Sequence, residues 1–270
     1  MVEVQNFAFG LLNPVLAYVM SCLGCFLGLQ CTTRARALAG MARARWLLLA
    51  GVSIGTTGIW VMHFIAMLGF SIPGGAIQYN VPVTILSMLI AVAVVSIGLL
   101  IVGFGGEGQG PLLLGGTIIG LGVASMHYMG MWAMRMPDTM GYNAGLLALS
   151  VVIAIVAGTA ALWAALRLRR LWSTFAASLI MGVAVSGMHY TGMAALRVYA
   201  ARPGEGMAAM GSGASGASFL LPLIMGISVL AFLVTAIVTL APTEAEIRED
   251  AELMERIARL SRDTANRRQL

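Results

Sequence analysis

The three histidines of this chain all occur within copies of one short motif. Each copy reads Met-His-aromatic-x-small-Met, and each lies near the end of a long apolar run. Thioether sulfur is a soft donor that suits Cu(I), and imidazole suits copper and zinc. The repetition therefore indicates a soft metal site and not a packing pattern. The copies span residues 62–67, 126–131 and 188–193.

Helical spacing pairs the donors within each copy. The histidine and the last methionine are i and i+4, so they share one face of a helix. The first methionine is rotated away by about 100° and has a less defined role. The nitrogen and sulfur pairs are His63 with Met67, His127 with Met131, and His189 with Met193. The first methionines are Met62, Met126 and Met188.

The residues between the donors also suit a site shared by three helices. Ala66, Gly130 and Gly192 precede the last methionines, and small residues allow membrane helices to approach closely. Tyr128 and Tyr190 follow their histidines. Their hydroxyls would either hydrogen-bond to a metal ligand or belong to an interfacial aromatic belt, and both interpretations stay open.

The composition places these motifs in a membrane. Hydrophobic residues make up 59% of the 270 residues and charged residues 10%, whereas soluble domains carry about 25% charged residues. Runs of about 20 apolar residues predict seven helices, the first of them retained and not cleaved. The predicted fold is an all-α polytopic membrane protein. The predicted spans are 7–29, 46–69, 82–104, 112–134, 144–166, 174–196 and 218–240.

The arginines predict the orientation. Thirteen of the 16 lie between spans 1 and 2, between spans 5 and 6, or after span 7. By the positive-inside rule the N-terminus is outside and the C-terminus is cytoplasmic. Spans 2, 4 and 6 then run outward, so all three motifs lie in the outer leaflet. The net charge of +5 reflects topology and not nucleic-acid binding, and the absence of lysine excludes a retinal Schiff base.

Spans 2–3, 4–5 and 6–7 look like three copies of one hairpin, with span 1 added in front. We expect a membrane domain over 1–241, with irregular outer loops at 70–81 and 197–217. Residues 242–270 are expected to form a cytoplasmic helix that Thr243 and Glu246 cap. This helix is either solvated or docks a partner. Met134, Met136 and Met140 lie at the end of span 4 or in the loop after it and could form a second, looser site, and Met207 and Met210 lie in the last outer loop.

The donor set narrows the chemistry. The predicted spans contain no carboxylate, which argues against magnesium, calcium and di-iron sites. Zinc would more often bring cysteine or carboxylate ligands, so copper fits best. Cys22, Cys25 and Cys31 are interpreted as packing residues. No nucleophile–base or carboxylate pair lies in the spans, so we expect no enzymatic activity.

The string Met188-His189-Tyr190-Thr191 resembles the signature of the MHYT family. The fragment 58–64 and Asn13-Pro14 are similar to the second and first helices of that family. The resemblance implies a bacterial seven-helix sensor domain in the inner membrane, with copper held by the motif histidines and methionines. It also implies that the sensed input is a diatomic gas, namely oxygen, carbon monoxide or nitric oxide. Copper itself or its redox state stays open as another input.

Family members often continue into output enzymes, but this sequence stops after one cytoplasmic helix. We therefore expect a separate cytoplasmic signalling partner that contacts this helix, unless the sequence is a shortened one. Two alternatives stay open. A copper transport or handling protein would need further ligands along the whole path, and a haem-binding membrane cytochrome would use two of the histidines as axial ligands.

Overall fold

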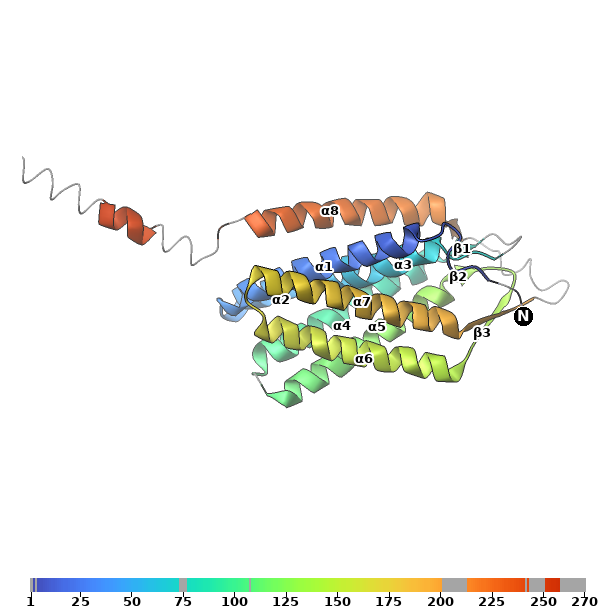
Figure 1. The fold of residues 1–270 in the computed structure, drawn as a ribbon, viewed down its shortest axis with the longest axis horizontal. Coiled ribbons are helices and arrows are strands. Elements are labelled where there is room, and N and C mark those ends of the chain that lie inside the picture. Colours follow the sequence, from blue (N-terminus) through green and yellow to red (C-terminus); the bar gives the residue numbers. More distant parts are fainter. Residues whose placement is uncertain are drawn as a thin grey trace, which may run out of the picture.

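Seven membrane-length helices lie side by side in the described part of the chain (Figure 1). The computed structural model describes residues 2, 4–72, 77–106, 108–200, 213–240, 242 and 251–257. The predicted all-α polytopic membrane fold is confirmed. The helices are α1 (Leu12–Arg36), α2 (Gly40–Ser53) continued by η1 (Ile54–Val61) and α3 (Met62–Leu68), α4 (Val81–Phe104), α5 (Gln109–Trp132), α6 (Ala144–Arg167), α7 (Leu171–Ala195), and η3 (Gly216–Leu220) continued by α8 (Leu221–Leu240).

The first helix differs most from its predicted span. It begins at Leu12 and continues to Arg36, where the apolar run predicts 7–29. Polar residues extend it because their hydroxyls bond within the helix: Thr32 and Thr33 both donate to the Leu29 carbonyl, at 2.8 and 3.0 Å. Hydropathy alone does not register such internally satisfied hydroxyls.

The second span contains a π-helix that the periodicity does not predict. This segment, η1, ends directly before Met62 and His63. Glycines let it approach its neighbours, since a Cβ at Gly24 of α1 would lie 2.2 Å from the Gly58 nitrogen. A Cβ at Gly55 would lie 2.7 Å from Cα of Val92 in α4. The π-helix η1 thus packs closely against both α1 and α4, and π-helical segments within α-helices are frequent at functional sites.

Six of the helices form a closed ring. Going round, the α2–η1–α3 helix packs on α4, α4 on α5, α5 on α6, α6 on α7, α7 on α1, and α1 on α2. The helix α8 lies outside the ring, against α1 and η1 (Figure 1). The predicted third hairpin is therefore not a packed pair like the first two. The first helix, α1, which runs in the same direction, takes the place beside α7.

Short strands cover one end of the bundle. These are β1 (Gln78–Tyr79), β2 (Met134–Arg135), β3 (Thr139–Tyr142), β4 (Leu196–Tyr199) and β5 (Ala214–Ser215). They pair antiparallel as β2-β1-β5 and β3-β4, which links the loop of every repeat to those of the other two. The prediction of irregular loops at 70–81 and 197–217 is wrong for β1, β4 and β5, because the backbone groups of the loops at this end form hydrogen bonds with one another.

Equivalent hydrogen bonds mark the repeat. The Asn80 amide donates to the Ala133 carbonyl and the Asn143 amide to the Ala195 carbonyl, both at 2.8 Å. The two asparagines also cap the next helix, since each side-chain oxygen accepts from the backbone three residues later at 3.1 Å. The ends of the second and third motif helices, α5 and α7, are thereby tied to the starts of α4 and α6, the helices that follow the first and second motifs.

Three further predictions concern the C-terminal segment, the last outer loop and the cysteines. Residues 251–257 are helical beyond α8 (Figure 1). The predicted cap at Thr243 and Glu246, and the loop methionines Met207 and Met210, lie outside the described residues. The three cysteines are free thiols, and Cys25 and Cys31 are buried.

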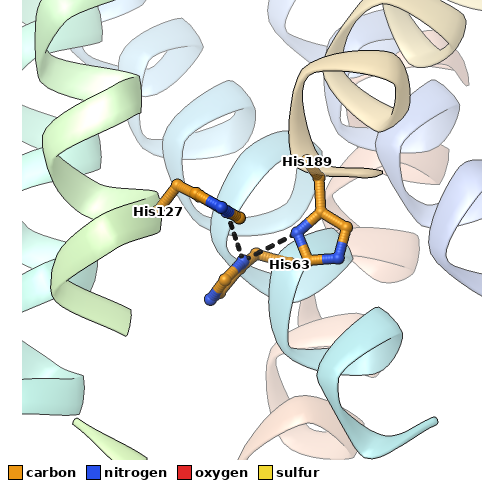
Figure 2. Close-up of side chains that lie close together, drawn as sticks. All are labelled: His63, His127 and His189. Atoms are coloured by element: carbon orange, nitrogen blue, oxygen red, sulfur yellow. Dashed lines mark hydrogen bonds between the residues drawn. The ribbon is translucent and has the colours of Figure 1, made fainter. Parts of the chain in front are cut away.

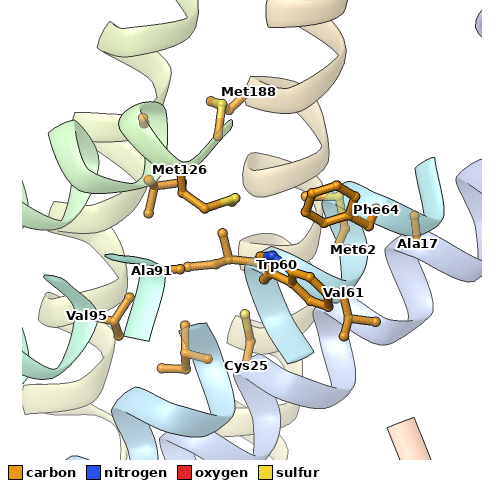
Figure 3. Packing of buried hydrophobic residues seen from close by; sticks show 14 of the residues in the cluster. Ala17, Cys25, Trp60, Val61, Met62, Phe64, Ala91, Val95, Met126 and Met188 are labelled. Carbon is orange, nitrogen blue, oxygen red and sulfur yellow. The ribbon is translucent and has the colours of Figure 1, made fainter. Parts of the chain in front are cut away.

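The core is concentrated around the motif helices. Trp60 and Phe64 are fully buried, and Figure 3 shows them in one cluster with Met62, Met126 and Met188. The Trp60 indole donates to the Thr84 carbonyl at 3.2 Å and to the Ser87 hydroxyl at 3.1 Å, which joins η1 to α4. This packing fixes the helix that carries the first histidine.

Candidate metal centre

The three motif histidines meet inside the ring of helices, near the strand-covered end (Figure 2). The Nδ1 atom of His63 lies 3.0 Å from Nδ1 of His189 and 3.2 Å from Nδ1 of His127. Their ring centroids are 4.9 to 5.1 Å apart, and all three side chains are at most 1% exposed. The predicted convergence of three imidazoles from three helices is thus present.

Hydrogen bonds among the three imidazoles cannot satisfy all of their ring nitrogens. A neutral imidazole nitrogen carries either one proton or one lone pair. The single Nδ1 of His63 faces two other Nδ1 atoms, so it cannot form two full hydrogen bonds. The Nε2 atoms of His63 and His127 have no hydrogen-bond partner in the described part of the chain. Burying ring nitrogens without hydrogen-bond partners costs free energy. A cation bound by the Nδ1 lone pairs would give these three atoms a partner.

The spacing of the nitrogens also fits a metal ion. Ligand atoms about 2.0 Å from a shared tetrahedral ion lie roughly 3.3 Å from one another. The two Nδ1 separations of 3.0 and 3.2 Å are close to this value. The seven spans contain no aspartate or glutamate, so the donors available are imidazoles and sulfur atoms, a set that suits copper and, through imidazole, zinc.

Glycines of the next repeat make room for two of the rings. A Cβ at Gly130 would lie 2.4 Å from Nε2 of His63, and one at Gly192 would lie 2.3 Å from Nε2 of His127. Real side chains do not approach this closely, so a side chain at either position would have to displace the neighbouring imidazole. The small residue of each of these motifs thus receives the histidine of the preceding motif.

The aromatic residue after each histidine packs against that histidine edge to face. The centroid distances are 4.7 Å for Phe64 and 4.9 Å for Tyr128 and Tyr190. The Tyr128 hydroxyl bonds to Ser150 at 2.6 Å and not to an imidazole. The Tyr190 hydroxyl has no partner in the described residues. The tyrosine rings therefore pack against the imidazoles, and among the described residues neither hydroxyl bonds to a histidine, which was one of the two roles left open for them.

All six motif methionines are buried in the same bundle. The last methionines, Met67, Met131 and Met193, are at most 4% exposed, and so are Met62, Met126 and Met188. Met134 and Met136 are buried as well, and Met140 lies in β3 and is partly buried. Sulfur is therefore plentiful in the core of the bundle that holds the histidines. The assignment of particular thioethers as metal ligands stays a prediction.

Two residues of α1 that support the site lie outside the histidine motifs. Asn13 of α1 donates to the Ile65 carbonyl at 2.7 Å, and Ser21 donates to the Gly58 carbonyl at 2.7 Å. Both bonds hold the first helix against the histidine-bearing one. A polar residue in an apolar span is the sequence signal for both, and Asn13 also belongs to the Asn13-Pro14 string that resembles the first helix of the MHYT family.

These features define a class: a polytopic helical membrane protein, built from internal repeats, whose buried histidines gather at one end. The sequence matches the profile of the MHYT family, described as a bacterial signalling protein N-terminal repeat, over residues 57–116 and 120–178. The chain belongs to this family.

Curated relatives agree with the assignment. The bifunctional diguanylate cyclase/cyclic di-GMP phosphodiesterase MucR of Pseudomonas aeruginosa is 38% identical over 182 residues, 66% of this chain and 26% of MucR. The cyclic di-GMP phosphodiesterase NbdA of the same organism is 40% identical over 199 residues, 72% of this chain and 25% of NbdA. An uncharacterized signaling protein of Caulobacter vibrioides is 34% identical over 188 residues, 69% of this chain and 23% of that protein.

The similarity is confined to part of each relative. The chain spans about a quarter of the length of the curated relatives it matches. The enzymatic activities in their names belong to those whole proteins, and the expectation that this chain is not an enzyme stays a prediction. No solved structure matches the chain.

Proposed function

We propose that this chain is a membrane sensor that binds copper through His63, His127 and His189. The observation that carries the proposal is the convergence of three buried Nδ1 atoms whose contacts cannot all be hydrogen bonds. The motif methionines Met67, Met131 and Met193 are the candidates for further ligands. Family membership supports the signalling role, since the relatives are signalling proteins.

The chain's own residues would hold, orient and shield such an ion. The imidazoles supply three nitrogen donors, the aromatic neighbours fix their rings, and complete burial excludes water. Copper bound there would supply a soft, redox-active centre able to accept a small ligand such as a diatomic gas. Under the proposed orientation in the bacterial inner membrane, the site lies in the outer leaflet, where copper reaches it without crossing the bilayer.

A route for the signal follows from the packing. His63 follows η1 within two residues, and η1 packs against α8, the last helix before the C-terminal segment. A change in the histidine cluster would act on η1 and through it on α8. The receiver would be a cytoplasmic signalling domain or a separate partner, in keeping with the enzymatic regions named in the relatives.

The geometry favours this function over haem binding. The two axial ligands of a haem lie on opposite faces of the macrocycle, so the porphyrin separates their rings. Here the three imidazoles contact one another, with centroids 4.9 to 5.1 Å apart. Copper transport is less favoured because the described histidines all lie in one layer near one end of the bundle.

Elemental analysis of detergent-purified protein tests the proposal. The wild type, reconstituted with Cu(I) under reducing conditions, should hold copper stoichiometrically, and His127→Ala should lose it. The affinity loss should exceed the roughly 10–100-fold that changes beyond the ligands cause.

The control for this experiment is Cys31→Ala, which removes a buried soft thiol in the half of α1 distant from the strands and should leave the copper content unchanged. Absence of copper from the reconstituted wild type contradicts the proposal. Stoichiometric zinc or iron in its place would assign the site to another metal.

A further inference from the structure

An apolar cavity of about 50 Å³ lies within the ring of helices, directly behind the histidine cluster. Residues of α1, η1, α4, α5, α6 and α7 line it. Among them, Ile59, Val123 and Val185 each stand four residues before a motif histidine. The cavity therefore begins about one helical turn from the cluster, on the side away from the strands.

Small residues of α6 leave this space open. Ala154, Ala157 and Ala161 line the cavity from one face of the helix, at spacings of three and four residues. The helix equivalent to α6 in the preceding repeat is α4, and equivalent positions lie 63 residues apart. Gly158 of α6, which also lines the cavity, is equivalent to Val95 of α4. The repeats thus differ where the cavity lies, and the second repeat contributes less side-chain volume.

The lining chemistry selects the occupant. No lining side chain carries nitrogen or oxygen, and the polarizable atoms are the sulfurs of Cys25, Met181 and Met188. A buried water needs two to four polar partners, which this lining does not offer. Apolar cavities stay dry and accept molecules such as xenon or, when near 150 Å³, benzene. At about 50 Å³ this one suits an occupant of two or three atoms.

The cavity reaches the histidine motif through Met188. This residue lines the cavity, is 1% exposed and directly precedes His189. We propose that the cavity binds a small, neutral, apolar molecule of the size of a diatomic gas, at a position distinct from the histidine nitrogens. Its role as a sensed ligand rests on the proposed function, but binding itself requires no metal.

Xenon is the probe that tests the cavity. With methyl-labelled methionines, wild-type protein under rising xenon pressure should show saturable NMR shifts at Met181 and Met188. Met225, which is 59% exposed to the surroundings of the bundle, should respond only in proportion to pressure. Shifts proportional to pressure at all three methionines would overturn the proposal.

Two neighbouring alanines provide a matched pair of variants. Ala161→Leu fills the cavity and should weaken saturable binding by about tenfold or more. Ala160→Leu makes the same change on the exposed side of α6 and should leave binding intact. Equal xenon responses in the two variants would overturn the proposal. If Ala161→Leu does not fold, a second variant, Ile119→Ala, tests the cavity by enlarging it. This variant should bind cyclopropane, which the wild type should exclude. Equal cyclopropane binding by the two proteins would overturn the proposal.

The same measurement on His127→Ala separates the two proposals. Retained xenon binding in this variant shows that the cavity acts independently of the metal centre. If the wild type binds copper but shows no saturable xenon binding, the cavity proposal is wrong and the copper-sensor proposal stands. If it binds xenon but no copper, the copper-sensor proposal is wrong and the cavity proposal stands.

Discussion

His63 places the edge of its imidazole against the backbone of Gly130, so closely that a Cβ there would lie 2.4 Å from Nε2. His127 and Gly192 repeat this contact in the next pair of repeats, at 2.3 Å. Each contact joins the histidine of one motif to the small residue of the following one. The position of the rings, and with it the nitrogen cluster, depends on these glycines.

Gly130→Ala should therefore disrupt the site although it replaces no candidate ligand. The added methyl group must displace the His63 ring, so copper affinity should fall by about tenfold or more, as a loss of 1.4 kcal/mol implies. Copper titration of the purified protein measures this loss. The control is Gly187→Ala on α7, where a Cβ meets nothing within 4 Å. It should bind copper normally and be as stable as the wild type or more so by up to about 1 kcal/mol. Normal copper affinity in Gly130→Ala would contradict the packing argument.

The two motif tyrosines should respond differently to loss of their hydroxyls. Tyr128→Phe removes the 2.6 Å bond to Ser150 and should cost about 0.5–1.5 kcal/mol of unfolding free energy. Tyr190→Phe removes a hydroxyl with no partner among the described residues, so it should be neutral or slightly stabilising. Both keep the ring contact with histidine and should keep copper. Denaturant titration in mixed micelles compares them, and equal costs would show that the Tyr190 hydroxyl has a partner.

The cap of α6 is a separate structural prediction. Asn143→Ala removes the acceptor for the Leu146 amide, 3.1 Å away, and should cost about 0.5–2 kcal/mol. Asn143→Ser should restore most of the loss because serine is also a good N-cap. The backbone bond from residue 143 to Ala195 is common to all three proteins. Thermal unfolding in detergent checks the order, and a serine variant as weak as the alanine one would exclude the capping role.

The orientation predicts which end of the bundle faces outward. In a background with Cys22, Cys25 and Cys31 replaced by alanine, Thr139→Cys lies in the strand-covered end. It should react with a membrane-impermeant maleimide in intact cells. Ala39→Cys lies in the arginine-rich connection between α1 and α2 and should react only after permeabilisation. The reverse labelling pattern would invert the proposed topology and place the histidines near the cytoplasm.

The membrane spans and the positions of the motif histidines depend on local sequence, so the sequence alone predicts them. Apolar runs of membrane length define the spans, and the motifs at His63, His127 and His189 fall at the same end of three such spans. The arrangement of three histidines in one layer follows from periodicity alone, since spans that are two apart run in the same direction. The role of small residues beside the last methionines is also local, because close approach requires a small side chain.

Tertiary packing decided what span order cannot. The first helix lies between η1 and α7 while α8 lies outside the ring. Small residues allow both close contacts of α1, since Gly24 packs on Gly58 of η1, and Cys22 and Tyr18 pack on Gly182 of α7. The contacts between Nδ1 atoms, the bond from Tyr128 to Ser150 and the apolar cavity likewise depend on distances between separate helices. Hydropathy and charge specify how the chain crosses the membrane. Which helices then meet, and which atoms face one another, depends on the fit between their surfaces, and that is a property of the folded structure.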